Sequence, residues 1–178
     1  MYDYHDFELF MSMFEKNEYQ FQKQQNIQSL LCEIKQRFEV VYSAYMHKKH
    51  LKKFLGRIRI GQWHNINIEK IRTQYSVHDK ISAPICYVNM TELLVFRQHA
   101  VMTENEIVFR RGDKPIPYKE IVSVDLWRSA YGGVDITIQQ NAVNYSQRYL
   151  CIETFQYFFF VALNEIVRMK AWQWNTQG

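Results

Sequence analysis

Glycine and proline, the residues that most often shape catalytic loops, are scarce in this chain. Its 178 residues include six glycines and three prolines. No GxSxG, HExxH or glycine-rich phosphate-binding motif occurs, so the sequence gives no support for a serine hydrolase, a metalloprotease or a P-loop nucleotide-binding enzyme. We therefore predict a protein that is not an enzyme and needs no cofactor, and no small-molecule substrate is evident.

Cysteine is scarce as well. Cys32, Cys86 and Cys151 are far apart and form no CxxC pair or Cys/His cluster of the kind that binds zinc. An odd number of cysteines argues against a disulfide framework, so we predict buried free thiols in a reducing compartment. The amino terminus lacks the basic and apolar regions of a secretory signal, and no apolar run approaches the ~18 residues of a membrane span. The sequence thus predicts a cytoplasmic protein.

The first 55 residues contain no proline or glycine and have the apolar spacing of amphipathic helices. Apolar residues recur every three or four positions over 7–14 and again over 21–55, and Gly56 is a typical residue to end such a helix. We predict a helical arm over residues 1–60. Either residues 21–55 form one helix of roughly 50 Å whose apolar stripe another chain covers, or the short helix before Asn17 folds back as a hairpin.

After residue 79 the helix-favouring residues thin out and β-branched residues become frequent. Val134, Ile136 and Ile138 alternate with polar residues, which is the period of a half-buried strand. Similar runs give strand candidates at residues 83–89, 93–102, 107–110, 121–127, 134–139 and 147–152. Gly132-Gly133 and residues 141–144 mark chain reversals between them.

The chain ends in a predicted helix with Thr154 as its cap. Its apolar stripe consists of Phe155, Phe158, Phe159, Ala162, Leu163, Ile166 and Met169. With the preceding strands, this helix predicts an α+β fold in three parts. These are the helical arm over 1–60, a connector with a short helix over 61–78, and a sheet-and-helix domain over 79–178.

Aromatic residues make up 16 % of the chain, which is a high share. On the terminal helix, Phe160 falls on the side opposite the apolar stripe, and Trp172 and Trp174 follow near the end. Exposed aromatic side chains are enriched at protein interfaces. We therefore predict an interface that includes these three residues and Phe10 and Phe14 of the arm. The alternative is that the N-terminal helix covers this side of the terminal helix.

Three segments carry a resemblance to a known family. They are the AVMTENEIVFR hairpin of residues 100–110, the stretch Ile116-Pro117-Tyr118-Lys119-Glu120-Ile121, and the helix from Thr154. Over about residues 79–174 the chain resembles the pleckstrin-homology-like fold in its small bacterial and GRAM-type versions. The resemblance implies a curved antiparallel sheet or barrel, capped by the helix, that binds lipid headgroups, peptides or copies of itself. Lipid-binding members place several Lys and Arg around the first hairpin, where this chain has only Arg97.

The strongest charge feature is residues 46–60, MHKKHLKKFLGRIRI, which contain no acid. Its cations are Lys48, Lys49, Lys52, Lys53, Arg57 and Arg59. Cations are favoured near the C-terminal end of a helix, which is the structural interpretation. The functional interpretation is a patch that binds an anionic membrane or nucleic acid, with Leu51, Phe54 and Leu55 lying on the membrane surface. His47 and His50 stand three positions apart, but the flanking lysines disfavour a divalent cation, so we predict no metal site.

Two functions follow from these observations. The first is a non-enzymatic binding or assembly module that engages a protein partner or a second copy through its arm and aromatic surface. The second is attachment to a polyanion, either an anionic membrane or nucleic acid, through the segment from Lys48 to Arg59.

Overall fold

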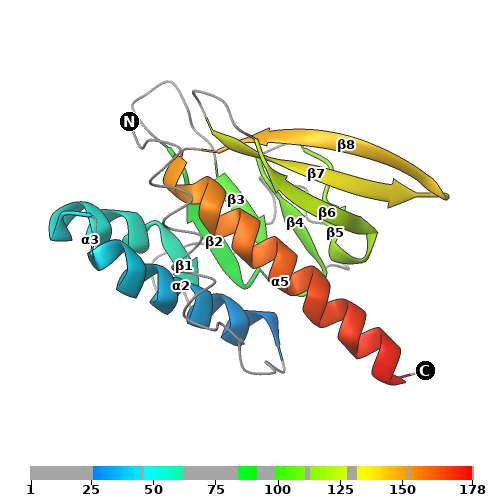
Figure 1. Ribbon diagram of the computed structural model, residues 1–178, viewed down its shortest axis with the longest axis horizontal. Coiled ribbons are helices and arrows are strands. Elements are labelled where there is room, and N and C mark those ends of the chain that lie inside the picture. The colour runs from blue at the N-terminus through cyan, green and yellow to red at the C-terminus, as the bar shows by residue number, and fades with distance from the viewer. Residues whose placement is uncertain are drawn as a thin grey trace.

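A computed structural model describes residues 26–44, 46–61, 84–91, 99–110, 113–127, 132–151 and 153–177 (Figure 1). It shows an α+β fold with N-terminal helices, two antiparallel sheets and a C-terminal helix. Phe10 and Phe14 of the predicted interface lie outside the described residues, and so does the predicted connector helix. The backbone of Trp172 and Trp174 is described as part of the terminal helix, but their side chains are not.

The arm consists of two helices, α2 (Ile27–Ser43) and α3 (Lys48–Gly56), so the prediction of one continuous helix over 21–55 is wrong. α2 begins at Asn26, whose side chain accepts a hydrogen bond from the Ser29 N–H at 2.8 Å. α3 begins at His47, which has an extended backbone and accepts a hydrogen bond from the Lys49 N–H through Nδ1 at 3.3 Å. The break lets α3 turn its apolar side to the core that α2 also faces, and Tyr42 meets Phe54 at 5.5 Å between ring centroids.

Eight strands form two separate sheets in the described part of the chain. The first has the order β1 (Ile58–Ile60), β2 (Cys86–Asn89), β3 (His99–Met102), β4 (Glu106–Val108) and β5 (Ile116–Pro117). The second has the order β6 (Ile121–Leu126), β7 (Gly133–Gln140) and β8 (Val143–Leu150), and the 3-10 turn η1 (Tyr118–Glu120) joins the two. No strand pairing between described residues joins the sheets, so they do not form the closed barrel that the resemblance allowed.

The described residues contain a strand at each predicted place, with two additions and shifted ends, and residues 93–98 of the predicted strand 93–102 lie outside the described residues. β1 and β5 were not predicted, and β1 continues directly from the arm into the sheet by pairing Ile58 with Val88 of β2. Gly133 was predicted to lie in a reversal but is the first residue of β7. The other reversal is only the two residues Asn141 and Ala142, both with positive φ, so β8 starts earlier than expected.

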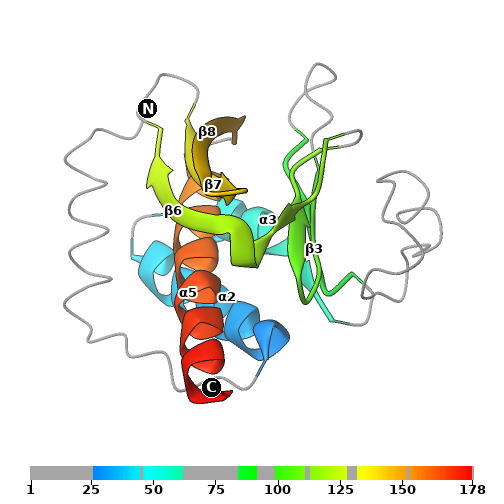
Figure 2. The ribbon, with the colours of Figure 1, turned by 90° about the vertical axis from the view of Figure 1, so that its right-hand side faces the viewer.

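The terminal helix α5 (Glu153–Gln177) fills the space between the sheets and α2. Figure 2 shows α5 beside α2, with the five-stranded sheet edge-on at the right and the three-stranded sheet crossing above. The predicted stripe is buried except for Met169, which is partly buried. Its rings meet three parts of the fold, since Phe158 contacts Phe38 of α2, Phe155 contacts Phe54 of α3, and Phe159 contacts Phe109 after β4. One hydrophobic core therefore includes residues of the arm and of both sheets.

The opposite side of α5 is covered too, which corrects the expectation of an exposed aromatic side. Phe160 is half-buried and packs against the core. Beside it, Gln156 Oε1 accepts the N–H of Gly133 at 2.8 Å, and Asn164 Nδ2 donates to the Val124 carbonyl at 3.2 Å. The three-stranded sheet covers this side of α5, whereas α2 packs on the side of Phe158. An interface role for Phe160 stays a prediction, but the full exposure of its ring that motivated the prediction is not found.

Candidate anion-binding surface

Helix α3 separates its apolar and its charged residues onto two sides. Leu51, Phe54 and Leu55 are buried in the core, while all four lysines of the helix are exposed. Residues four apart lie one above the other on a helix, so Lys48 with Lys52, and Lys49 with Lys53, form two adjacent rows. We call these four lysines the basic surface.

Where α3 begins bears on the two interpretations of these charges. Lys53 lies in the last turn, where the helix dipole favours a cation. Lys48 and Lys49 lie in the first turn, at the positive end of the dipole, and this turn contains no acidic residue. The dipole therefore accounts for Lys53 and disfavours the two lysines at the start. Stabilisation of the C-terminal end of α3 therefore does not explain all four lysines of the helix.

The basic surface also has no acid to balance it among the described residues. The ion pairs found there are Arg110–Asp113, Arg148–Asp135 and Arg168–Glu165, all in other parts of the fold. Two lysines at positions i and i+4 repel each other by about 0.2–0.5 kcal/mol. The surface is thus a local cost to folding stability that a ligand of opposite charge would offset.

The two arginines that follow α3 do not continue this surface. Arg57 is half-buried, and Arg59 lies on the face of the five-stranded sheet opposite the core, since its neighbour Ile58 is in the core. Arg57 follows α3 at once, and its carbonyl accepts the N–H of Asn89 at 2.9 Å, which fixes the helix end to β2. Arg59 is exposed on β1 and pairs in register with Tyr87. Lys35 of α2 donates from Nζ to the Ile58 carbonyl at 2.7 Å and is half-buried, and this burial lowers its pKa. Lys35 therefore anchors β1 and is not part of the basic surface.

A polar cluster that the sequence did not indicate lies next to Arg59. The hydroxyl of Tyr87 is 2.5 Å from His99 Nδ1, and Thr91 Oγ1 is 3.4 Å from His99 Nε2. The rings of Tyr87 and His99 are stacked, with their centroids 5.3 Å apart. Burial lowers the pKa of His99, so the imidazole is neutral at neutral pH and adds no charge to the basic surface. Tyr87 on β2 is 12 residues from His99 in the sequence and Thr91 is 8 residues away, so local spacing gives no sign of this cluster.

His47 and His50 do not form part of a metal site in the described structure. Their ring centroids are 6.0 Å apart, and His47 Nδ1 is used in the cap of α3. Within the described ranges no group of three His, Cys, Asp or Glu residues is arranged to hold a metal ion. We assign His47 a role in starting α3.

The cysteines are free thiols, and Cys86 and Cys151 are buried as predicted, whereas Cys32 is half-buried. Burial raises the pKa of the Cys151 thiol to about 12 and raises that of Cys86 as well. The thiolate is the nucleophilic form of cysteine, so both buried thiols are unreactive at neutral pH.

Comparison of the chain with protein-family models, with curated proteins and with solved structures finds no match in any of the three. In the described part of the chain, no helix is both long and apolar enough to span a bilayer.

Proposed function

We propose that this protein is a non-enzymatic module that attaches to an anionic membrane surface through the basic surface. The observation that carries the proposal is the exposed double row of lysines on α3, which includes the unfavourable first turn of the helix. Lysines kept where the helix dipole opposes them, with no described acid nearby, are accounted for by a ligand that is itself negative.

The contact is electrostatic and does not insert apolar side chains. Leu51, Phe54 and Leu55 were expected to lie on the membrane, but they face the protein core and are at most 9 % exposed. A Lys or Arg near an anionic bilayer contributes about 1 kcal/mol, so the four lysines of the basic surface supply on the order of 4 kcal/mol. Such a contact is weak and reversible, and it weakens as salt screens the charges.

Two features favour a lipid surface over nucleic acid. Lysine, a compact and strongly hydrated charge, makes up all the cations of α3, whereas arginine is the residue that binds single phosphates in a bidentate geometry. The exposed residues of α3 include no Phe, Tyr or Trp on which bases of a single strand would stack. The positive electrostatic field of these lysines suits a layer of anionic headgroups, because binding to such a layer requires no contacts with bases.

We also propose that residues 86–177 have a pleckstrin-homology-like fold. The support is the order of elements, with strands β2 to β8 in two antiparallel sheets followed by one helix that packs against them. Lipid headgroups are among the ligands that this resemblance implies. Here the cations lie on the preceding helix α3 instead of the first hairpin of the domain, so the basic surface is a site outside the resembling region.

Co-sedimentation with vesicles tests the proposal. The vesicles contain phosphatidylcholine alone or with phosphatidylserine, at about 50 and about 200 mM salt, a range in which electrostatic binding weakens strongly. We expect the native chain to bind only the anionic vesicles and to lose most binding at the higher salt. The variant K48Q/K49Q/K52Q/K53Q keeps helix propensity and should not bind. No sedimentation of the native chain at the lower salt contradicts the proposal.

A matched pair of variants separates a local site from net charge. K48Q/K49Q and K114Q/K119Q each remove two exposed lysines, and the second pair lies outside the basic surface. We expect the first to weaken vesicle binding clearly and the second to leave it almost unchanged. Equal losses would mean that net charge alone drives binding. Gel shifts with generic DNA and RNA are done in parallel, and binding to these without binding to vesicles would overturn the membrane assignment.

Assembly through the arm, the other predicted function, finds no support in α2, and residues 1–25 of the arm lie outside the described residues. The core covers the apolar stripe of α2, whose residues are at most 5 % exposed: Ile27, Leu30, Leu31, Ile34, Phe38, Val41 and Tyr42. Val40, which is 63 % exposed, lies outside this stripe. No uncovered stripe remains on α2 for a second chain. An assembly surface has to be sought elsewhere in the fold.

A further inference from the structure

Strand β8 forms a long edge of the three-stranded sheet. It pairs with β7 over eight consecutive residue pairs without an irregularity, and all its residues except Tyr149 are exposed. Figure 1 shows the β7–β8 hairpin extending away from the helices. The hairpin turn is the two residues Asn141 and Ala142, so hydrogen-bonded pairs alternate from Val143 onwards. The backbone N–H and C=O groups of Asn144, Ser146 and Arg148 therefore point outward from the sheet.

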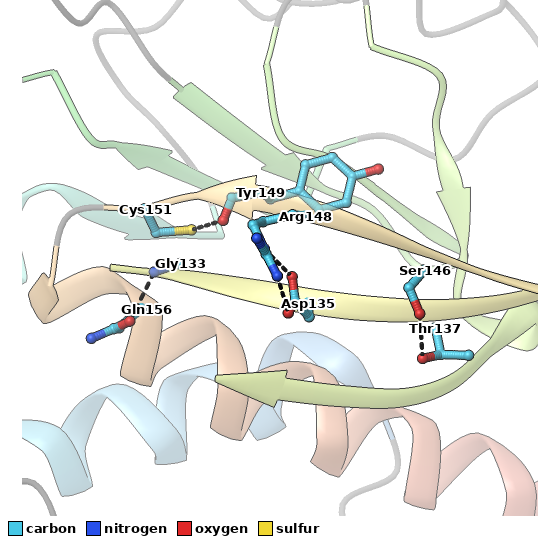
Figure 3. A network of polar contacts seen from close by, with 8 residues as sticks. All are labelled: Gly133, Asp135, Thr137, Ser146, Arg148, Tyr149, Cys151 and Gln156. Carbon is cyan, nitrogen blue, oxygen red and sulfur yellow. Dashed lines mark hydrogen bonds and ion pairs between the residues drawn. The ribbon is translucent and has the colours of Figure 1, made fainter. Parts of the chain in front are cut away.

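Side-chain pairs on one face of the sheet join β8 to β7 (Figure 3). Arg148 donates to Asp135 at 2.8 and 3.1 Å and lies over the ring of Trp127 at 4.3 Å. Closer to the hairpin turn, the hydroxyl of Thr137 on β7 is 3.2 Å from the hydroxyl of Ser146 on β8. These contacts tie β8 to β7, and they balance the single charge of β8.

The other sheet edges carry the features that usually block strand addition. β1 has three residues and exposes Arg59, and β5 has two residues and ends in Pro117. β6 has an irregular register between Ile121 and Ser123. β8 contains no proline, no lysine and no bulge, and its one charged side chain, Arg148, is paired with Asp135. Among the described strands it is the edge best able to accept another strand.

We propose that β8 pairs antiparallel with β8 of a second copy of this chain, which joins the two three-stranded sheets into one across a two-fold axis. The outward backbone groups of Asn144, Ser146 and Arg148 are centred on Ser146, so a two-fold axis there matches each of their donors with an acceptor of the other copy. Asn144 then lies opposite Arg148 of the second copy, and no two like charges meet. Tyr145, which is 39 % exposed, gains the second Tyr145 as a diagonal neighbour.

This self-complementarity is the reason for choosing a second copy as the occupant. A strand of unrelated sequence would satisfy the backbone groups of β8 equally well. A second β8 also places an uncharged side chain opposite each Arg148. A contact of one strand pair is small, and small interfaces are typical of weak and transient complexes. The association does not depend on the basic surface.

Sedimentation velocity over about 5 to about 500 µM protein, a range chosen for a weak contact, tests the proposal. The native chain should pass from monomer to dimer within this range. Ser146→Lys places two ammonium groups beside the two-fold axis and should weaken dimerisation by about tenfold or more. Gln139→Lys adds the same charge on the same face of the neighbouring strand β7, away from the axis, and should dimerise nearly as the native chain does.

The folded state of both variants is checked by circular dichroism and thermal unfolding. A native chain that stays monomeric at the highest concentration overturns the proposal. A folded Ser146→Lys variant that dimerises like the native chain also overturns it, since the contact would then lie elsewhere. The quadruple lysine variant of the basic surface should dimerise normally, which separates this result from the test of membrane attachment.

Discussion

The two antiparallel sheets of this protein differ in the length of their strands and in how far their side chains are exposed to solvent. The strands of the five-stranded sheet have two to four residues, and most of their side chains are buried. Those of the three-stranded sheet have six to eight residues, and β8 is almost wholly exposed. The short strands of the five-stranded sheet do not extend beyond the hydrophobic core, so they leave little exposed surface for a partner. The longer strands run past the core, and there the exposed residues Val143 and Tyr145 are found.

The two sheets meet through aromatic rings and not through backbone pairing. Phe109, which follows β4, stacks on Tyr149 of β8 with centroids 4.3 Å apart and meets Phe159 of α5 at 5.1 Å. Side-chain packing of this kind depends on shape and apolar area, so it is sensitive to truncation at one site. We expect the largest effects of substitution at this junction and smaller ones along the exposed sheet.

Phe159→Ala should have the largest effect because Phe159 of α5 is fully buried and packs against Phe109, the residue at which the two sheets meet. Truncating a buried phenylalanine costs about 3–5 kcal/mol, a large part of the ~5–15 kcal/mol of a typical domain. Urea unfolding measures the loss. Val122→Ala, at a β6 residue that is 50 % exposed, is the control and should change the free energy of unfolding by about 0.5 kcal/mol or less. A similar loss in both variants would mean that the junction is not tightly packed.

Gly133→Ala should come next and should act on the three-stranded sheet. A Cβ at this position would lie 2.6 Å from the Tyr149 carbonyl oxygen and 3.0 Å from the Trp127 ring. Overpacking of this kind costs about 1–3 kcal/mol. Gly56→Ala is the matched control, because a Cβ there meets no atom within 4 Å and alanine favours a helix. Unfolding curves should therefore shift in opposite directions, and an unaffected Gly133→Ala variant would contradict the close approach of β7 and β8.

Arg148→Gln should have the smallest effect on stability. The Arg148 guanidinium is exposed to solvent, and ion pairs of that kind are screened and contribute little. We expect the unfolding midpoint to change less than in Gly133→Ala, and the difference from the native chain to shrink as salt is raised. A loss as large as that of Phe159→Ala would show that the Asp135–Arg148 pair, and not the core, holds β8 in place.

Much of the fold was predictable where a regular pattern extends over many residues. The buried stripe of α5 from Phe155 to Ile166 and the alternation of Val134, Ile136 and Ile138 both agree with the structure. Strands of two or three residues, such as β5 and β1, are too short to show a period, so they were missed. The cluster of Tyr87, Thr91 and His99 was missed because pairing between β2 and β3 brings its members together.

By itself the sequence determined the α+β class, the apolar sides of the helices and the run of cations from Lys48 to Arg59, because each depends on local spacing and charge. Tertiary structure decided what surrounds them. The break before His47 turned Lys48 and Lys49 from the end of a long helix into the start of a short one, which reversed the sign of the helix dipole at those residues. Packing also buried Leu51, Phe54 and Leu55, half-buried Phe160 and left β8 at an edge. Which side of an element is covered depends on its neighbours in space, and those are distant in the chain.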